Sequence, residues 1–152
     1  MRNLKAWIES KLRPGSRRVA EADAASPNLS VAALLVEILR ADYQATAAER
    51  RQVLTSIRGL LDLGEDECEE LLLRAEQRID QAHDLYQFTS QINRTYSHAD
   101  KVRLVEQLWR VAQADDLVHK YEEHLIRRIA DLLHVPHREY IAAKLRATDG
   151  RG

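Results

Sequence analysis

The chain has 152 residues, 45% of them hydrophobic, which suits a single domain with one core. Its 23 basic and 24 acidic residues leave a net charge of −1, so overall charge gives no reason to expect nucleic-acid binding. The single cysteine, Cys68, excludes an internal disulfide. We expect neither a membrane span nor secretion, because no apolar run approaches the roughly 20 residues that cross a bilayer and no signal-peptide stretch opens the chain.

Residues 1–29 are predicted to form an N-terminal arm and a linker. Residues 2–12 fit a short amphipathic helix, whose apolar face carries Leu4, Trp7, Ile8 and Leu12. We favour a helix that packs on the domain or frays over a membrane-surface anchor. Residues 13–29 are rich in small and polar residues with Pro14, Gly15 and Pro27, a composition typical of a linker.

The next stretch predicts a pair of helices. Ser30 is a suitable N-cap for a largely apolar helix over 31–41. Thr46 has a glutamate three residues later, which is the spacing of a capping box and predicts the start of a second helix. We expect this second helix to run to about Leu61 and to end near Gly64.

The middle of the chain predicts two more helices. Acidic residues open the segment from Glu65 to about Arg78, where the helix dipole favours them. Its buried side is expected to include Cys68 as a small thiol, together with Leu71, Leu72 and Ala75. Residues 83–95 have an apolar stripe of their own, so we expect a bend near 79–83.

The last third predicts three helices. Ser97 has an aspartate three residues later and should cap a helix that runs to Gln113. A second helix follows a short acidic loop and should end at Pro136; its stripe consists of Leu125, Ile126, Ile129, Leu132 and Leu133. Residues 137–146 are expected to form the last helix, and 147–152 a disordered tail.

The predicted fold is therefore all-α, a single-domain bundle of seven or eight helices over residues 30–146. No stretch alternates polar and apolar residues as a strand would. We expect one core that buries together residues from distant helices, namely Leu35, Ile38, Val53, Ile57, Leu108, Trp109, Ile126, Ile129 and Leu133.

The two helix-loop-helix segments carry a similar acidic pattern. Asp42 and Asp115 are 115 − 42 = 73 positions apart, and Glu49 and Glu122 are 122 − 49 = 73 positions apart. The ends of the following helices match with an offset of 136 − 64 = 72. We interpret these matches as an internal duplication with pseudo-twofold symmetry.

The role of these four acids has three readings. Asp42 and Asp115 should lie where helices end, and the dipole disfavours an acid there unless something compensates. Loop N–H groups could do so, with Glu49 and Glu122 acting as helix-cap residues, and we favour this reading. A divalent cation shared by each Asp and Glu is the alternative, which makes the four residues a tentative metal site. Recognition of a partner by the acids is the third reading.

More specific motifs do not fit. The loops lack the 12-residue ligand spacing and central glycine of an EF-hand. His119 and His124 are five residues apart, so they do not share a helical face as zinc-binding pairs do. We find no glycine-rich phosphate loop and no catalytic triad pattern.

The repeated Ala-Asp-x6-Glu pattern before an apolar helix resembles the TerB family of tellurite-resistance proteins, and is similar to the related domain of the membrane co-chaperone DjlA. The segment from Asp84 through Leu104–Ala112 to Val135 carries most of the resemblance, which covers about residues 30–146. Tyr43 and Asp116 depart from it, because the family usually has glycine after the aspartate.

The resemblance implies a cytoplasmic bacterial protein with acidic residues proposed to bind metal and an association with membrane-bound stress complexes. We expect a non-catalytic module that acts through protein partners, with a peripheral position at the inner membrane as one alternative. The rival function is divalent-cation binding through the acidic loops, linked to tellurite resistance. A metal-assisted enzyme ranks last, since the sequence shows acids but no cleft.

Overall fold

A computed structural model describes residues 26–41, 46–81, 84–114, 118 and 120–149. Within these ranges the chain forms seven α-helices and no strand, which confirms the all-α prediction. Their bounds are α3 Pro27–Ala41, α4 Ala47–Leu61, α5 Glu65–Gln81, α6 Tyr86–Thr95, α7 His98–Ala112, α8 Lys120–Leu132 and α9 His137–Asp149. The predicted helix over residues 2–12 lies outside the described residues.

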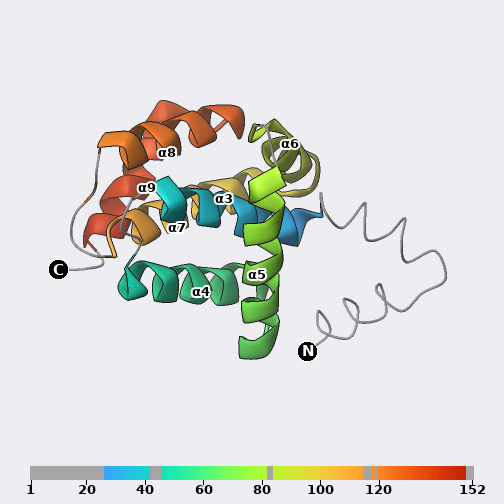
Figure 1. Cartoon of the computed structure of the whole chain (residues 1–152). Coiled ribbons are helices and arrows are strands. Elements are labelled where there is room, and N and C mark those ends of the chain that lie inside the picture. The colour runs from blue at the N-terminus through green and yellow to red at the C-terminus, as the bar shows by residue number, and fades with distance from the viewer. Residues whose placement is uncertain (1–25, 42–45, 82–83, 115–117, 119, 150–152) are drawn as a thin grey trace.

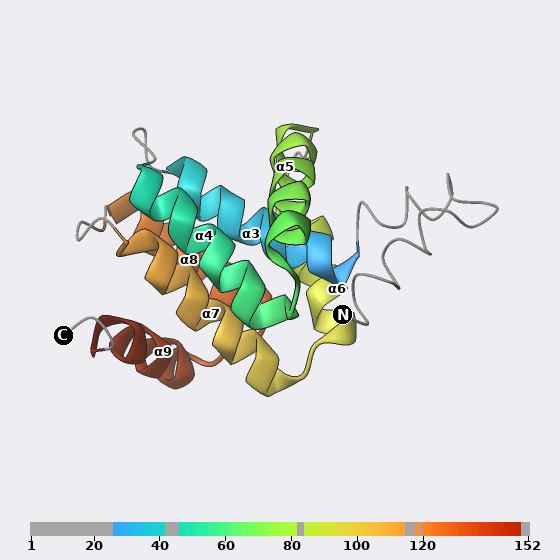
Figure 2. The same ribbon diagram turned by 90° about the horizontal axis from the view of Figure 1, so that it is seen from below.

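Helices α3 and α7 form the centre of the bundle. They pack against each other, with α4 on one side of the pair and α8 on the other (Figures 1 and 2). Helix α5 packs on α3, and α9 packs on α7 as an outer helix (Figure 2). Helix α6 contacts α3 and α8. Because α3 meets five other helices, its side chains from Leu29 to Leu39 are all buried except that of Glu37.

The predicted core is confirmed. All nine residues expected to be buried together are at most 1% exposed and belong to one cluster. Trp109 is the largest fully buried side chain, and its ring lies 5.8 Å from that of Tyr140 on α9. The predicted burial of Cys68, Leu71, Leu72 and Ala75 is confirmed as well.

Several features repeat between the segments α3–α5 and α7–α9. Glu49 and Glu122 are both fully buried in the first turns of α4 and α8. Asp62 and His134 follow these two helices with left-handed backbone angles, φ 53° and φ 60°, and they are 134 − 62 = 72 positions apart. These features agree in position with the predicted repeat, but the internal duplication itself stays a prediction.

The prediction that Ser30 caps the first helix is wrong. Helix α3 begins at Pro27, and Ser26 is its N-cap: the Ser26 hydroxyl accepts from the Leu29 N–H at 3.2 Å. Proline is well suited to the first helical position, because its missing N–H would have no intrahelical partner there. Ser30 lies one turn inside the helix and is buried.

The predicted end of α4 at about Leu61 is confirmed, but the residue that ends it and the end of α9 differ from expectation. Asp62, rather than Gly64, takes the left-handed conformation that ends α4. Gly64 instead precedes α5, where its N–H donates to Glu67 Oε1 at 2.9 Å. Helix α9 runs past Arg146 to Asp149 because Ala147 is buried and Thr148 accepts a hydrogen bond from Gln113 at 2.9 Å.

Helix α8 ends at Leu132, before the predicted end at Pro136, and His134 after it has a left-handed backbone. Two other boundaries agree with expectation. Helices α5 and α6 separate between Gln81 and Tyr86, close to the predicted bend. Ser97 caps α7 by accepting from the Asp100 N–H at 3.1 Å, as predicted. None of the described helices combines the length and the apolar character needed to cross a membrane.

Candidate functional site

Two of the four predicted acidic residues can be placed. Glu49 and Glu122 occupy the first turns of α4 and α8, and both are 0% exposed. Asp42 and Asp115 lie outside the described residues, so the tentative four-residue site stays a prediction. Full burial of a carboxylate at both positions was not expected from the sequence, which placed them only in helix caps.

The helix-cap role of Glu49 is confirmed. Its N–H donates to Thr46 Oγ1 at 3.1 Å, while its Oε1 accepts from the Thr46 N–H at 3.3 Å. These two bonds make up the capping box that the sequence predicts. The carboxylate also lies at the positive end of the helix dipole, which favours its charge.

Glu49 and Glu122 belong to the same end of the bundle. In both ribbon views, α3 and α7 end where α4 and α8 begin (Figures 1 and 2). Carboxylate oxygens are the ligands that Ca²⁺ and Mg²⁺ prefer. Residues 26–41, 46–81, 84–114, 118 and 120–149 contain no cluster of three or more His, Cys, Asp or Glu suited to a metal. The described residues therefore supply one carboxylate from each segment, a ligand type that suits a hard cation, but they do not make up a complete metal site.

A second candidate surface lies between α7 and α9. A groove of about 380 Å³ lies along the contact between the two helices, and its apolar lining consists of the small side chains of Ala99, Val102 and Ala142. We call it the α7–α9 groove. His98 and Glu139 contact each other at one end, and Arg146 lines the other.

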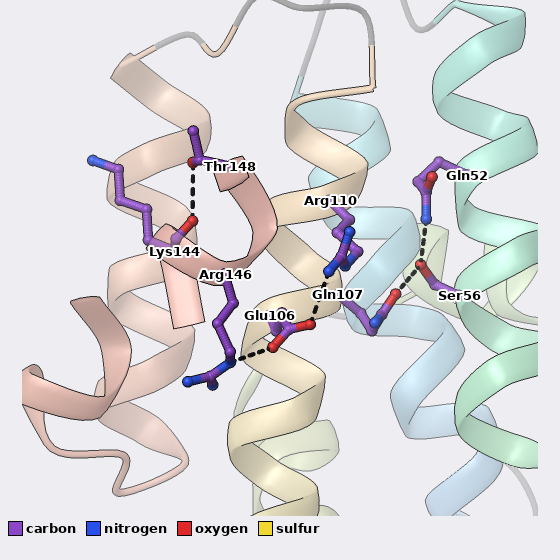
Figure 3. Close-up of polar contacts among 8 residues, drawn as sticks. All are labelled: Gln52, Ser56, Glu106, Gln107, Arg110, Lys144, Arg146 and Thr148. Atoms are coloured by element: carbon purple, nitrogen blue, oxygen red, sulfur yellow. Dashed lines mark hydrogen bonds and ion pairs between the residues drawn. The ribbon is translucent and has the colours of Figure 1, made fainter. Parts of the chain in front are cut away.

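An ion cluster fastens α9 to α7 beside the groove. Figure 3 shows Arg146 of α9 reaching Glu106 of α7, where Nε donates to Oε1 at 2.7 Å. The other carboxylate oxygen, Oε2, accepts from Arg110 at 3.1 Å. Burial alone would raise the pKa of Glu106, but the hydrogen bonds and charges of the two arginines hold it below its ordinary value. Glu106 is therefore ionised at neutral pH and holds the two helices together.

The other side of α9 is held by aromatic and charged contacts. Lys144 Nζ lies 5.0 Å from the Trp109 ring centroid and 3.6 Å from Glu123 of α8. With Tyr140 packed on Trp109, these contacts fix the rotation of α9 about its axis. Fixed in this way, α9 keeps Ile141 and Leu145 outward, with exposed fractions of 36% and 54%.

Sequence reasoning did not find this surface. Ile141 and Leu145 are four residues apart and share a helical face, a pattern that by itself predicts burial. Tyr140, Ala143 and Ala147 form the face that is buried instead. The sequence did carry a signal for this exposed surface. Helix α9 has two apolar faces, and a helix at the edge of a bundle can bury only one of them.

Comparison with known proteins identifies the family. Residues 28–145 match the family model described as "Tellurite resistance protein TerB", which covers most of the chain. No curated protein and no solved structure gives a significant match. The match agrees with the all-α bundle and with the resemblance seen in the acidic pattern. The chain therefore belongs to the TerB family of tellurite-resistance proteins.

Proposed function

We propose that this TerB-family chain is a non-catalytic module that binds a protein partner through the α7–α9 groove and the outer face of α9. The observation that supports the proposal is the continuity between groove and outer face. Ala142 belongs to the apolar lining of the groove, and Leu145, three residues later, is its neighbour on the helix surface. Apolar surface thus extends from Val102 across Ala142 to Leu145.

The shape and chemistry of the groove fit an amphipathic helix. It has this apolar lining and its ends carry charge, as in recognition modes where a helix lays its apolar face in a groove. The eight helical steps from His98 to Glu106 rise about 12 Å along α7, enough for roughly two turns of a partner helix. The charged groups at the two ends, His98 with Glu139 and Glu106 with Arg146, would fix its register.

Co-purification with matched variants tests this surface. Leu145→Glu and Ala142→Glu introduce a charge where the partner would bury apolar side chains, and we expect each to reduce recovery of the partner at least about tenfold, or 1.4 kcal/mol. Leu73→Glu is the control, because Leu73 is 55% exposed on α5. Equal recovery with all three variants, at wild-type helical content, would contradict the proposal.

The family suggests where such a partner would be found. We propose that the module acts in a bacterial stress-response or membrane-associated complex, in the cytoplasm or at the inner membrane surface. Growth of a deletion strain on tellurite, with and without the Leu145→Glu variant, tests the link to tellurite. Restoration of growth by the variant as fully as by wild type would separate tellurite tolerance from this surface.

The buried glutamates favour a second candidate function, divalent-cation binding. Glu49 and Glu122 place one buried carboxylate from each segment at the same end of the bundle, and carboxylate oxygens are ligands that hard divalent cations prefer. Oxygen ligands would select calcium, magnesium or manganese over softer metals. Calorimetric titration with these ions and with zinc tests the idea: saturable binding that Glu122→Gln weakens would support it, and the absence of heat with every ion would refute it.

A further inference from the structure

A cleft of about 420 Å³ opens between α3, α8, the last turn of α5 and the residues that precede α6. Figure 1 shows the arrangement of these helices, with α8 and α6 above α3. Glu37 of α3 lines it, with Arg40 one turn later, Asp84 before α6 and Arg128 on α8. The α7–α9 groove is formed by other residues, so an inference about this cleft does not depend on that groove.

Glu37 is unusual in its helix. It is the one charged residue between Leu29 and Leu39, and it is half-buried among neighbours that are fully buried. Burial raises the pKa of its carboxyl above the ordinary value, although the Arg40 charge lowers it. Within the described ranges, Glu37 accepts no hydrogen bond. A partly desolvated carboxylate of this kind gains free energy from any ligand that donates to it.

The walls of the cleft favour a ligand with an aliphatic stem. Leu85 and Leu125 are partly buried against the core, and the Tyr121 ring is 66% exposed beside them. Lysine and arginine side chains pack their methylene groups on apolar surface while their charged heads reach a polar partner. An aromatic ring adds a cation–π contribution to such a head.

The rim residues narrow the choice of ligand. Arg40 and Arg128 are exposed, so an acid bound to them would be screened by water. One carboxylate oxygen of Asp84 already accepts a hydrogen bond from the Tyr86 N–H, at 2.8 Å, at the first turn of α6. Arg128 would repel a run of basic residues but would accept an acidic neighbour of a single basic residue.

We propose that this cleft receives a lysine or arginine side chain of a partner polypeptide, with its cationic head on Glu37 and its stem on Leu85 and Leu125. The residue next to it in the partner is acidic and meets Arg128. The site would therefore recognise a basic residue with an acidic neighbour in a polypeptide, rather than a run of basic residues.

Amide chemical-shift titration of the full ¹⁵N-labelled chain tests the proposal. The probe is the blocked peptide acetyl-Ala-Lys-Glu-Ala-amide, in which the acidic residue directly follows the lysine. We expect saturable shifts in the second half of α3 and in α8, with a Kd of about 1 mM, as suits one charged side chain. Glu37→Gln should weaken binding at least about fivefold, whereas Glu123→Gln, an exposed change on α8, should leave it unchanged.

Three results would overturn the proposal. The first is equal binding of the same peptide with norleucine in place of lysine, which has the stem but no charge. The second is unchanged affinity in Glu37→Gln, or no saturable shift in the cleft. The third is equally tight binding of butylamine, which would make the cleft a site for free amines rather than for a polypeptide.

Discussion

Removing the charge of Glu106 is predicted to destabilise the bundle and loosen α9. Its carboxylate accepts two charge-assisted hydrogen bonds, at 2.7 Å from Arg146 and 3.1 Å from Arg110. Such bonds contribute about 1.5–3 kcal/mol when buried, but Glu106 is 18% exposed and Arg146 51% exposed, so solvent screening reduces this. We expect Glu106→Gln to lower the free energy of unfolding by about 1–2 kcal/mol, which corresponds to a Tm lower by roughly 2–8 °C for a domain of this size.

The pH dependence of this loss has a definite sign. The pKa of Glu106 is lower in the folded chain than its ordinary value of 4.5, so its ionised form stabilises the folded state above pH 4.5. That stabilisation is lost as the pH falls through the folded pKa. The difference in Tm between wild type and Glu106→Gln should therefore be full at pH 7 and shrink below pH 4.5.

Thermal unfolding followed by circular dichroism at pH 7 and at acidic pH provides the assay. Glu76→Gln is the matched control, because Glu76 also joins two helices through an arginine, Arg50 at 3.2 Å, but is 36% exposed where Glu106 is 18% exposed. We expect the control to cost less than about 0.5 kcal/mol. A Glu106 variant no less stable than the control at pH 7, or a difference that persists unchanged in acid, would refute the reasoning.

Three further predictions concern single positions. Glu37→Gln should have a higher free energy of unfolding than wild type at pH 7, and this difference should disappear in acid. The reason is that burial raises the pKa of Glu37, so its charged form opposes folding as the pH rises. Chemical denaturation at pH 7 and at acidic pH measures the difference. Ser26→Ala should lower the free energy of unfolding by about 1 kcal/mol through loss of the cap on the Leu29 N–H, and a fully stable variant would show that the cap is dispensable. If Glu122 binds a cation, millimolar calcium or magnesium should raise the Tm of wild type but not of Glu122→Gln, whereas equal shifts would exclude this residue from any cation site.

The helices could be predicted from sequence because their signals are local. Stripes of apolar residues and capping patterns at Thr46 and Ser97 depend only on nearby residues, and the structure confirms them. The errors came where two local signals compete. Ser26 followed by proline gives an earlier start than Ser30, and Asp62 adopts the left-handed angle that glycine usually takes.

The candidate sites were harder to predict because they depend on which helices meet. The full burial of Glu49 and Glu122 follows from the packing of α4 and α8 against the central pair, and no spacing along the chain reports it. The cleft beside Glu37 and the groove beside Ala142 likewise require helices that are distant in sequence. A charged residue inside an otherwise apolar helix is the one local signal that marks Glu37 in advance.

Site-specific photo-crosslinking from the outer face of α9 tests the central claim most directly. A benzophenone-bearing amino acid replaces Leu145 in cells that express the chain natively, and the same residue at position 73 on α5 serves as the control. The proposed function predicts one discrete protein adduct from position 145, none from position 73, and loss of the adduct when Ala142→Glu is added in a chain that remains folded. Adducts of equal yield from both positions, or an adduct from position 145 that survives Ala142→Glu, would contradict partner binding at the α7–α9 groove.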